Sequence, residues 1–182
     1  MDAAQALFLA QGVGETTIEQ VTSAAGVGKG TFYLYFSSKE DVLAGLGQRF
    51  AQGLLARVRA AVAATPGEDW RAALAAWVRA CAGGYLDSIQ IHDLAFFASP
   101  PANRYGRVRN VIVDHLAGLL EEGATAGAWS IDDARLTAVF LFSGLHGVVD
   151  DAVIAVKGPR RRRLLDAVER IALRAVVLPA RG

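Results

Sequence analysis

Apolar residues recur three and four positions apart along almost the whole chain, and no stretch alternates apolar and polar residues with a period of two. Spacings of three and four place apolar side chains on one face of an α-helix, whereas a half-buried strand needs alternation. Glycine, proline, serine and threonine interrupt the pattern where helices commonly start and stop. The sequence therefore predicts an all-α protein of about nine helices.

Three short helices are expected first, over residues 2–11, 16–26 and 28–35. The second can begin with a capping box, in which two side chains three positions apart each bond the other's backbone. Two pairs have this spacing, Thr16 with Glu19 and Thr17 with Gln20. The side chains expected to form a core between these helices are Leu7, Phe8, Ile18, Val21, Val27, Phe32 and Phe36.

Further helices are expected over residues 39–62, 70–85, 94–97, 108–119 and 132–156, and a last one with Pro159 in its first turn. Ser37 or Ser38 can cap the first of these, and Ser130 can cap the fifth. The one natural boundary lies near Gly45 to Gly47, where short helices give way to long ones. We therefore expect two domains, residues 1–46 and 47–182.

The composition argues against a membrane protein, a secreted protein and a disulfide-bonded protein. Apolar residues make up 53% of the 182 residues, but charges and glycines interrupt them, so no membrane span is expected. The first residues do not have the pattern of a signal peptide. The single cysteine, Cys81, excludes an internal disulfide and a cysteine-rich metal site. These features fit a cytoplasmic protein.

Charge is unevenly distributed along the chain. The first 47 residues contain two lysines against five carboxylates, a net charge of −3, although the whole chain carries +1. The rest is therefore basic, with a run from Arg160 to Arg163. We expect this run to form an exposed helix start with ion pairs at its rim; a second DNA-binding patch is the alternative.

The second and third helices, joined by A-A-G-V-G, have the size and turn of a helix-turn-helix. The exposed surface expected on the third helix consists of Gly28, Lys29, Gly30, Thr31, Tyr33, Leu34 and Tyr35. Tyrosine and threonine hydroxyls, lysine ammonium groups and backbone amides are common donors to DNA phosphates, which favours DNA binding. The alternative is that Phe32, Tyr33, Tyr35 and Phe36 form one buried aromatic cluster.

The segment T-T-I-E-Q-V-T-S-A-A-G-V-G-K-G-T-F-Y-L-Y-F-S-S-K-E-D-V-L resembles the N-terminal signature of the TetR (tetracycline repressor) family of bacterial transcription regulators, over residues 3–46. The resemblance implies an N-terminal DNA-binding domain and a C-terminal domain for ligand binding and dimerisation. It also implies that Thr17, Thr31, Tyr33 and Lys39 hold DNA phosphates.

Lys29 is the candidate base reader, because lysine can donate to guanine O6 and N7 in the major groove. Leu34 or Tyr35 can contact a thymine methyl group or the adjacent backbone, and Gly28 and Gly30 leave room for the duplex. Glu19 either accepts from a cytosine amine or belongs to a solvated helix face. The chain opens at Met1-Asp2 without the basic arm common in relatives. We therefore expect few phosphate contacts, unless an arm precedes residue 1 in the natural protein.

The helix over residues 132–156 is apolar almost all round, which predicts that one face packs in the core and another on a partner. In relatives the last two helices form a four-helix dimer interface, and a two-fold dimer suits a palindromic operator. The alternative is that both faces are intramolecular core. The expected interface residues are Leu141, Leu145, Val148, Ala152, Leu164, Leu165, Val168, Ile171 and Ala172.

Relatives also enclose a ligand cavity among the middle helices, and apolar walls with a few polar groups suit a small hydrophobic or aromatic effector. The candidate lining residues are Trp77, Cys81, Tyr85, Phe96, Phe97, Ile112, His115, Phe140, Ser143 and His146. His146 and Asp150 have a spacing that can bind a metal, but no third ligand is identifiable. We therefore expect no metal and no cofactor.

These features predict a homodimeric, ligand-responsive DNA-binding regulator, most simply a repressor. An activator of the same fold is the alternative, since promoter geometry decides the sign of regulation. The sequence contains no evident nucleophile with a nearby base and no phosphate-binding loop, so no enzyme activity is expected. An all-α enzyme or carrier that uses the apolar cavity is the rival from another class.

Overall fold

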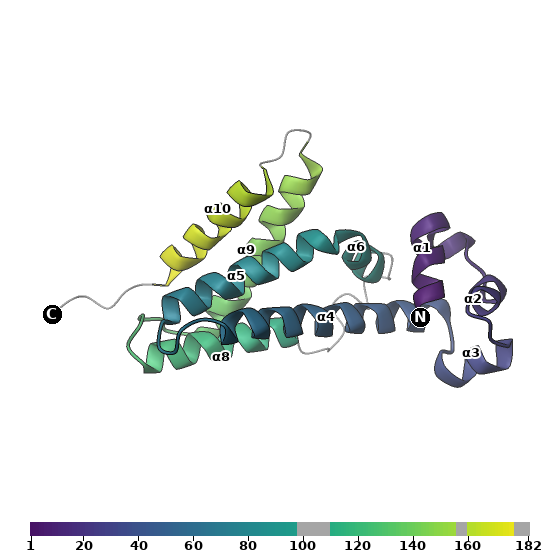
Figure 1. Cartoon of the computed structure of the whole chain (residues 1–182), viewed down its shortest axis with the longest axis horizontal. Coiled ribbons are helices and arrows are strands. Elements are labelled where there is room, and N and C mark those ends of the chain that lie inside the picture. Colours follow the sequence, from purple (N-terminus) through teal and green to yellow (C-terminus); the bar gives the residue numbers. More distant parts are fainter. Residues whose placement is uncertain (98–109, 156–159, 177–182) are drawn as a thin grey trace. The chain divides into compact units, whose positions relative to one another are not determined.

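The computed structural model describes residues 1–97, 110–155 and 160–176, and within these ranges the regular structure is helical (Figure 1). The all-α prediction is thus confirmed. The helices are α1 (Asp2–Glu15), α2 (Ile18–Ala24), α3 (Lys29–Tyr35), α4 (Lys39–Ala63), α5 (Trp70–Asp87), α6 (Ile89–Phe97), α8 (Val111–Thr125), α9 (Ala134–Ile154) and α10 (Arg161–Ala175). Val108 and Pro159, which we expected in helices, lie outside the described residues.

The chain forms two compact units. The first unit comprises Met1–Gln52 and Ser88–Val108, and the second comprises Gly53–Asp87 and Arg109–Gly182. Helix α4 contributes its first half to one unit and its second half to the other. The domain division that we expected after residue 46 falls within this continuous helix.

Helix α1 is longer than predicted. It was expected to stop before Gly12, but the chain resumes helical structure after a kink there and reaches Glu15. Gly12 has φ +84°, a left-handed conformation that other residues rarely adopt. The glycine therefore bends the helix instead of ending it.

Two helix starts agree with the predicted caps. Thr17 and Gln20 form the capping box of α2, with Gln20 N donating to Thr17 Oγ1 at 3.2 Å and Thr17 N to Gln20 Oε1 at 2.8 Å. At α4, Asp41 N donates to Ser38 Oγ at 3.2 Å. Of the alternatives left open, Thr17 and Ser38 are therefore the capping residues.

The cap expected for α9 is wrong. Asp133, rather than Ser130, caps the helix, since Leu136 N donates to Asp133 Oδ1 at 2.8 Å. The helix accordingly starts at Ala134, two residues later than predicted. A carboxylate is as good an N-cap as a hydroxyl, so the adjacent aspartate takes the position closer to the helix.

The core of the first unit joins its three short helices to the start of α4. Its buried members are Ala4, Phe8, Val21, Phe32, Val42, Leu43 and Leu46. Val27 was expected among them but is 42% exposed. Gly26, at φ +66°, ends α2, and Val27 N then donates to Thr22 O at 3.0 Å. This helix-ending motif explains why the Val27 side chain is not part of the core.

In the second unit α5 packs along α10, and α8 packs along α9 (Figure 1). The largest fully buried side chains there are Trp77, Trp129 and Tyr85. The Trp129 indole donates to Leu120 O at 2.8 Å and covers Gly123 so closely that a Cβ atom there would lie 2.1 Å from the ring. Only glycine fits this position without a rearrangement of the core.

One helix among the described residues, α9, is long and apolar enough to cross a membrane by length and composition alone. Its Ala138, Leu141, Leu145 and Val149 are buried in the second unit, and its other residues are half-buried or exposed. Such a single helix is weak evidence for a membrane span.

Candidate nucleic-acid interface and second-unit core

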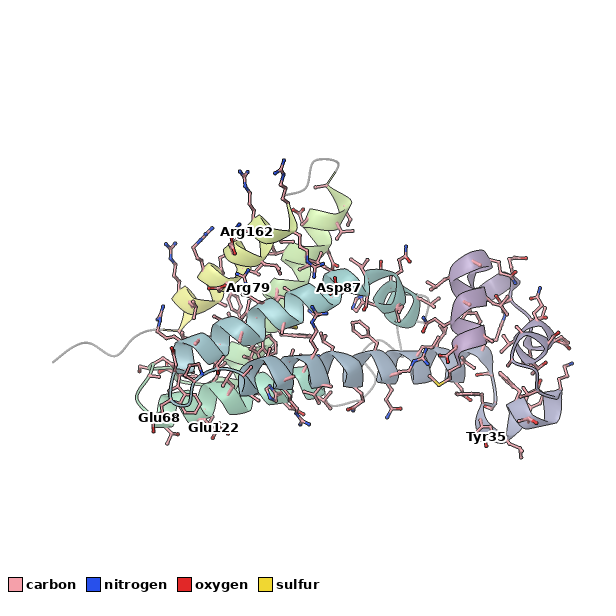
Figure 2. All side chains as sticks on the ribbon, viewed as in Figure 1. Tyr35, Glu68, Arg79, Asp87, Glu122 and Arg162 are labelled. Carbon is pink, nitrogen blue, oxygen red and sulfur yellow. The ribbon has the colours of Figure 1, made fainter. Side chains whose placement is uncertain are left out.

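The surface of α3 presents aromatic, aliphatic and hydroxyl side chains to solvent. Tyr33 is 54% exposed and Tyr35 76% exposed, whereas Phe32 is buried and contacts the Tyr33 ring edge-on at 5.4 Å. Figure 2 labels Tyr35 on this short helix. The alternative in which both tyrosines belong to a buried cluster is therefore wrong. We define the α3 surface as Gly28, Lys29, Gly30, Thr31, Tyr33, Leu34 and Tyr35, all exposed.

Lys29 does not stand alone on the α3 surface. Its ammonium group forms an ion pair with the carboxylate of Glu19 on α2. The hydrogen bond from Lys29 lowers the pKa of Glu19, and the same bond raises the pKa of Lys29. Both groups thus carry their full charges at neutral pH. The partners lie ten positions apart and on different helices, so no helical spacing indicates this pair.

Lys39 has a different environment from the one expected of a phosphate clamp. Its Nζ donates to three backbone carbonyl oxygens, of Val13 at 2.7 Å, Gly14 at 3.1 Å and Thr16 at 2.8 Å. A lysine ammonium has three hydrogens, so all its donors are used. In this structure Lys39 therefore joins the start of α4 to the last turn of α1 and the residue that follows it, and its ammonium has no donor left for a phosphate.

Thr17 and the two glycines of the α3 surface keep the access that DNA contact requires. The Thr17 hydroxyl accepts from Gln20 N, which leaves its own hydrogen available to a phosphate oxygen. A Cβ atom added to Gly28 or Gly30 would meet nothing within 4 Å. The backbone there is open to a ligand from outside. Thr16, in contrast, is buried and donates to Gly12 O at 2.7 Å.

In the second unit, four of the predicted ligand-binding residues are buried or half-buried and make polar or ring contacts. The Trp77 indole donates to His115 Nδ1 at 3.1 Å, and burial lowers the pKa of His115 so that the ring is neutral and can accept. The Tyr85 hydroxyl donates to Asp150, and the His146 ring lies 4.5 Å from the Tyr85 ring. These contacts connect α5 with α8 and with α9.

The remaining candidates for the ligand site divide into three groups. Cys81 and Ile112 are buried. Phe140, 69% exposed, and Ser143, also exposed, do not line an interior site in this structure, which corrects their assignment. The side chains of Phe96 and Phe97 lie outside the described residues.

An open depression of about 560 Å³ in the second unit lies elsewhere, at the start of α5 and the end of α8. It is lined by Trp70, Gly118, Glu121, Glu122, Thr125 and Ala126, none of which we predicted as a ligand residue. His146 and Asp150 have no third metal-ligating side chain beside them in the described ranges.

The face of α9 expected to contact a partner is partly buried in the chain's own core. Leu141 and Leu145 were assigned to a partner but are buried in the chain's own core, as are Leu164, Val168 and Ala172 of α10. Ala152 and Leu165 are half-buried. Of the expected interface residues, Val148 and Ile171 are exposed. The exposed apolar face of α9, which we call the α9 outer face, consists of Leu136, Val139, Phe140 and Val148, with Ser143, Gly144 and Gly147 between them.

The arginine run at the start of α10 takes part in ion pairs. Arg161 donates to Asp87 at 2.6 Å, and Arg57 of α4 donates to the same carboxylate at 2.7 Å. Arg162 lies 3.9 Å from Asp166, and Figure 2 labels Arg162, Arg79 and Asp87 in this part of the second unit. The expectation of ion pairs at the helix start is confirmed for these two arginines.

A family model described as bacterial regulatory proteins of the tetR family matches residues 1–46. No curated protein matches the chain.

Several solved structures have a similar fold. A tetR-family regulatory protein from Rhodococcus RHA1 is 21% identical with a TM-score of 0.74, over 98% of this chain and 95% of that chain. The fatty acid degradation regulator FadR from Bacillus halodurans is 24% identical with a TM-score of 0.77, over 94% and 91%. The TetR-family regulator PfmR from Thermus thermophilus is 23% identical with a TM-score of 0.67, over 95% and 96%.

Proposed function

We propose that this chain is a transcription regulator of the tetR family: a cytoplasmic, homodimeric repressor that binds a palindromic DNA operator and leaves it when a small effector binds. The α3 surface carries the proposal. An exposed lysine, hydroxyl groups and two bare glycines lie together on one short helix. Such groups donate to phosphates and to base edges.

We infer that Thr17, Thr31, Tyr33 and Tyr35 make the phosphate contacts and that Lys29 contacts a base. Lys39 supports them indirectly, because its bonds to Val13, Gly14 and Thr16 fix the chain that leads into α2. With a net charge of −3 in the first 47 residues, affinity then depends more on placed hydroxyls than on bulk charge.

For the dimer we propose the α9 outer face as the contact, in place of the buried residues first expected. It exposes four large apolar side chains around small residues on one helix. Contiguous exposed apolar surface of this kind is typical of protein interfaces. A two-fold contact would bring two α3 surfaces to a palindromic site.

For the effector we propose a small hydrophobic or aromatic molecule bound among α5, α8 and α9, near the pairs Trp77–His115 and Tyr85–Asp150. Polar groups within an apolar interior can exchange an internal partner for a ligand. Binding that separates these helices would change the preferred dimer geometry. Coupling between such sites is typically about 1–3 kcal/mol.

The test is a pull-down of genomic fragments with the full chain, followed by fluorescence anisotropy on the enriched duplex. The double variant with Lys29→Ala and Tyr33→Ala should lose specific binding, while sedimentation shows an unchanged dimer. Arg71→Ala, an exposed change in the second unit, is the control. Retained specific affinity in the double variant would refute the proposed surface.

The same experiment separates the rival functions. An all-α carrier or enzyme would enrich no DNA fragment and show no salt-dependent DNA affinity. A reporter gene placed behind the enriched operator distinguishes a repressor, which lowers expression, from an activator, which raises it.

A further inference from the structure

Glu19 and Lys29 form an ion pair between α2 and α3 at the edge of the α3 surface. Their side chains are 61% and 53% exposed, so both retain free donors and acceptors toward solvent. Because Lys29 keeps Glu19 ionised, this carboxylate accepts hydrogen bonds and donates none. The surface thus presents a strong donor and a strong acceptor side by side.

This arrangement can be compared with the edges of base pairs in the major groove. A G·C pair presents two adjacent acceptors, guanine N7 and O6, followed by one donor, the cytosine N4 amine. An ammonium group can bond both acceptors while a carboxylate beside it accepts from the amine. An A·T pair instead places its donor between two acceptors, so a carboxylate that reached the adenine amine would also meet thymine O4.

We propose that Glu19 and Lys29 act together as a specificity-determining pair that recognises one G·C base pair in each operator half-site. Lys29 contacts the guanine and Glu19 contacts the cytosine, while the two side chains remain paired with each other. The inference rests on the proposed function, because it requires α3 to lie in the major groove. It also explains a carboxylate at this position: Glu19 repels phosphates and so lowers affinity for all DNA, but raises the preference for one base pair.

The test is selection of bound sequences from duplexes with randomised positions, using the full chain. The wild-type chain should enrich G·C at one position of each half-site. Glu19→Ala should bind all duplexes more tightly yet lose about tenfold of the preference at that position alone. Glu19→Gln should shift the same position toward A·T, because an amide bonds adenine N6 and N7.

Glu40→Ala removes an equal exposed charge from the first unit and is the matched control. It should leave every base preference unchanged. If the wild-type chain selects a defined operator but Glu19→Ala keeps the same base preferences, the paired recognition is overturned. The same holds if that operator contains no selected G·C pair. In both cases the proposed function still stands. A wild-type chain that enriches no sequence rejects the proposed function and this inference with it.

Discussion

The Nζ atom of Lys39 lies 2.7 Å from the carbonyl oxygen of Val13, 26 residues earlier in the chain. Two further carbonyls, of Gly14 and Thr16, complete its set of acceptors. The last carbonyls of a helix have no partner within it, and a cation stabilises that end. One side chain thus supplies the C-terminus of α1 with both hydrogen bonds and charge, and holds α4 to it.

Replacing Lys39 by Met should therefore destabilise the chain rather than only weaken DNA binding. Loss of hydrogen bonds to a charged group typically costs about 1.5–3 kcal/mol, and we expect a decrease of that size in the free energy of unfolding. Urea denaturation measures it. Lys29→Met is the matched control and should leave stability almost unchanged, since its ion pair is exposed. Unchanged stability in Lys39→Met would contradict the structural role.

Gly123→Ala should destabilise the second unit, because the new Cβ would lie 2.1 Å from the buried Trp129 ring. Overpacking of this kind costs about 1–3 kcal/mol. Gly118 lies on the same helix, and a Cβ there would meet nothing within 4 Å, so Gly118→Ala should be neutral or slightly stabilising. Thermal unfolding followed by Trp fluorescence compares the two. Equal melting temperatures would show that the core adapts freely at Gly123.

Cys81 should be unreactive in the folded chain. Burial raises the pKa of its thiol to about 12, which leaves only about one part in ten thousand as thiolate at pH 8. Iodoacetamide should label it only as fast as the chain unfolds, and quickly in urea. Rapid labelling of the native protein would contradict the burial.

The ion pairs of Asp87 should make a small, pH-dependent contribution to stability. Arg161, and then Arg57, lower the pKa of this carboxyl in the folded chain. Its stabilisation is present above the unfolded pKa of about 3.9 and is lost as the pH falls through the lower folded value. The side chain is 42% exposed, so we expect about 1 kcal/mol or less.

Asp87→Asn should accordingly lower the free energy of unfolding at pH 7, and this effect should fade as the pH falls through the lowered pKa of Asp87. Asp132→Asn, an exposed carboxylate at the start of α9, is the control and should not reproduce that pH dependence. A difference between Asp87→Asn and wild type that does not shrink as the solution is acidified would exclude the ion pairs as its cause.

The spacing of apolar residues was enough to predict that the helices exist, because it depends on residues close together in the chain. Caps and breakers are also local signals, and they indicated where most helices start or stop. The orientation of α9 was not predictable in the same way. Leu141 and Phe140 are neighbours on a helix that is apolar all round, and only the packing of α8 and α5 decides that Leu141 is buried and Phe140 exposed. The partners of Lys29 and Lys39 were likewise missed, since both contacts join separate helices or loops.

The engagement of both lysines of the first 47 residues gives a final prediction, on the salt dependence of operator binding. Each phosphate neutralised by a cation contributes a slope of about −0.9 to log K against log salt concentration. With Lys39 bound to carbonyls and Lys29 paired with Glu19, at most one cation of each α3 surface is available. A dimer should then show a slope of about −2 or shallower.

Glu19→Ala, which frees Lys29, should make this salt dependence steeper, whereas Glu40→Ala should have little effect on it. Anisotropy titrations from low to moderate salt measure these slopes, and a wild-type slope steeper than about −6 would mean that cations outside the α3 surface carry the binding.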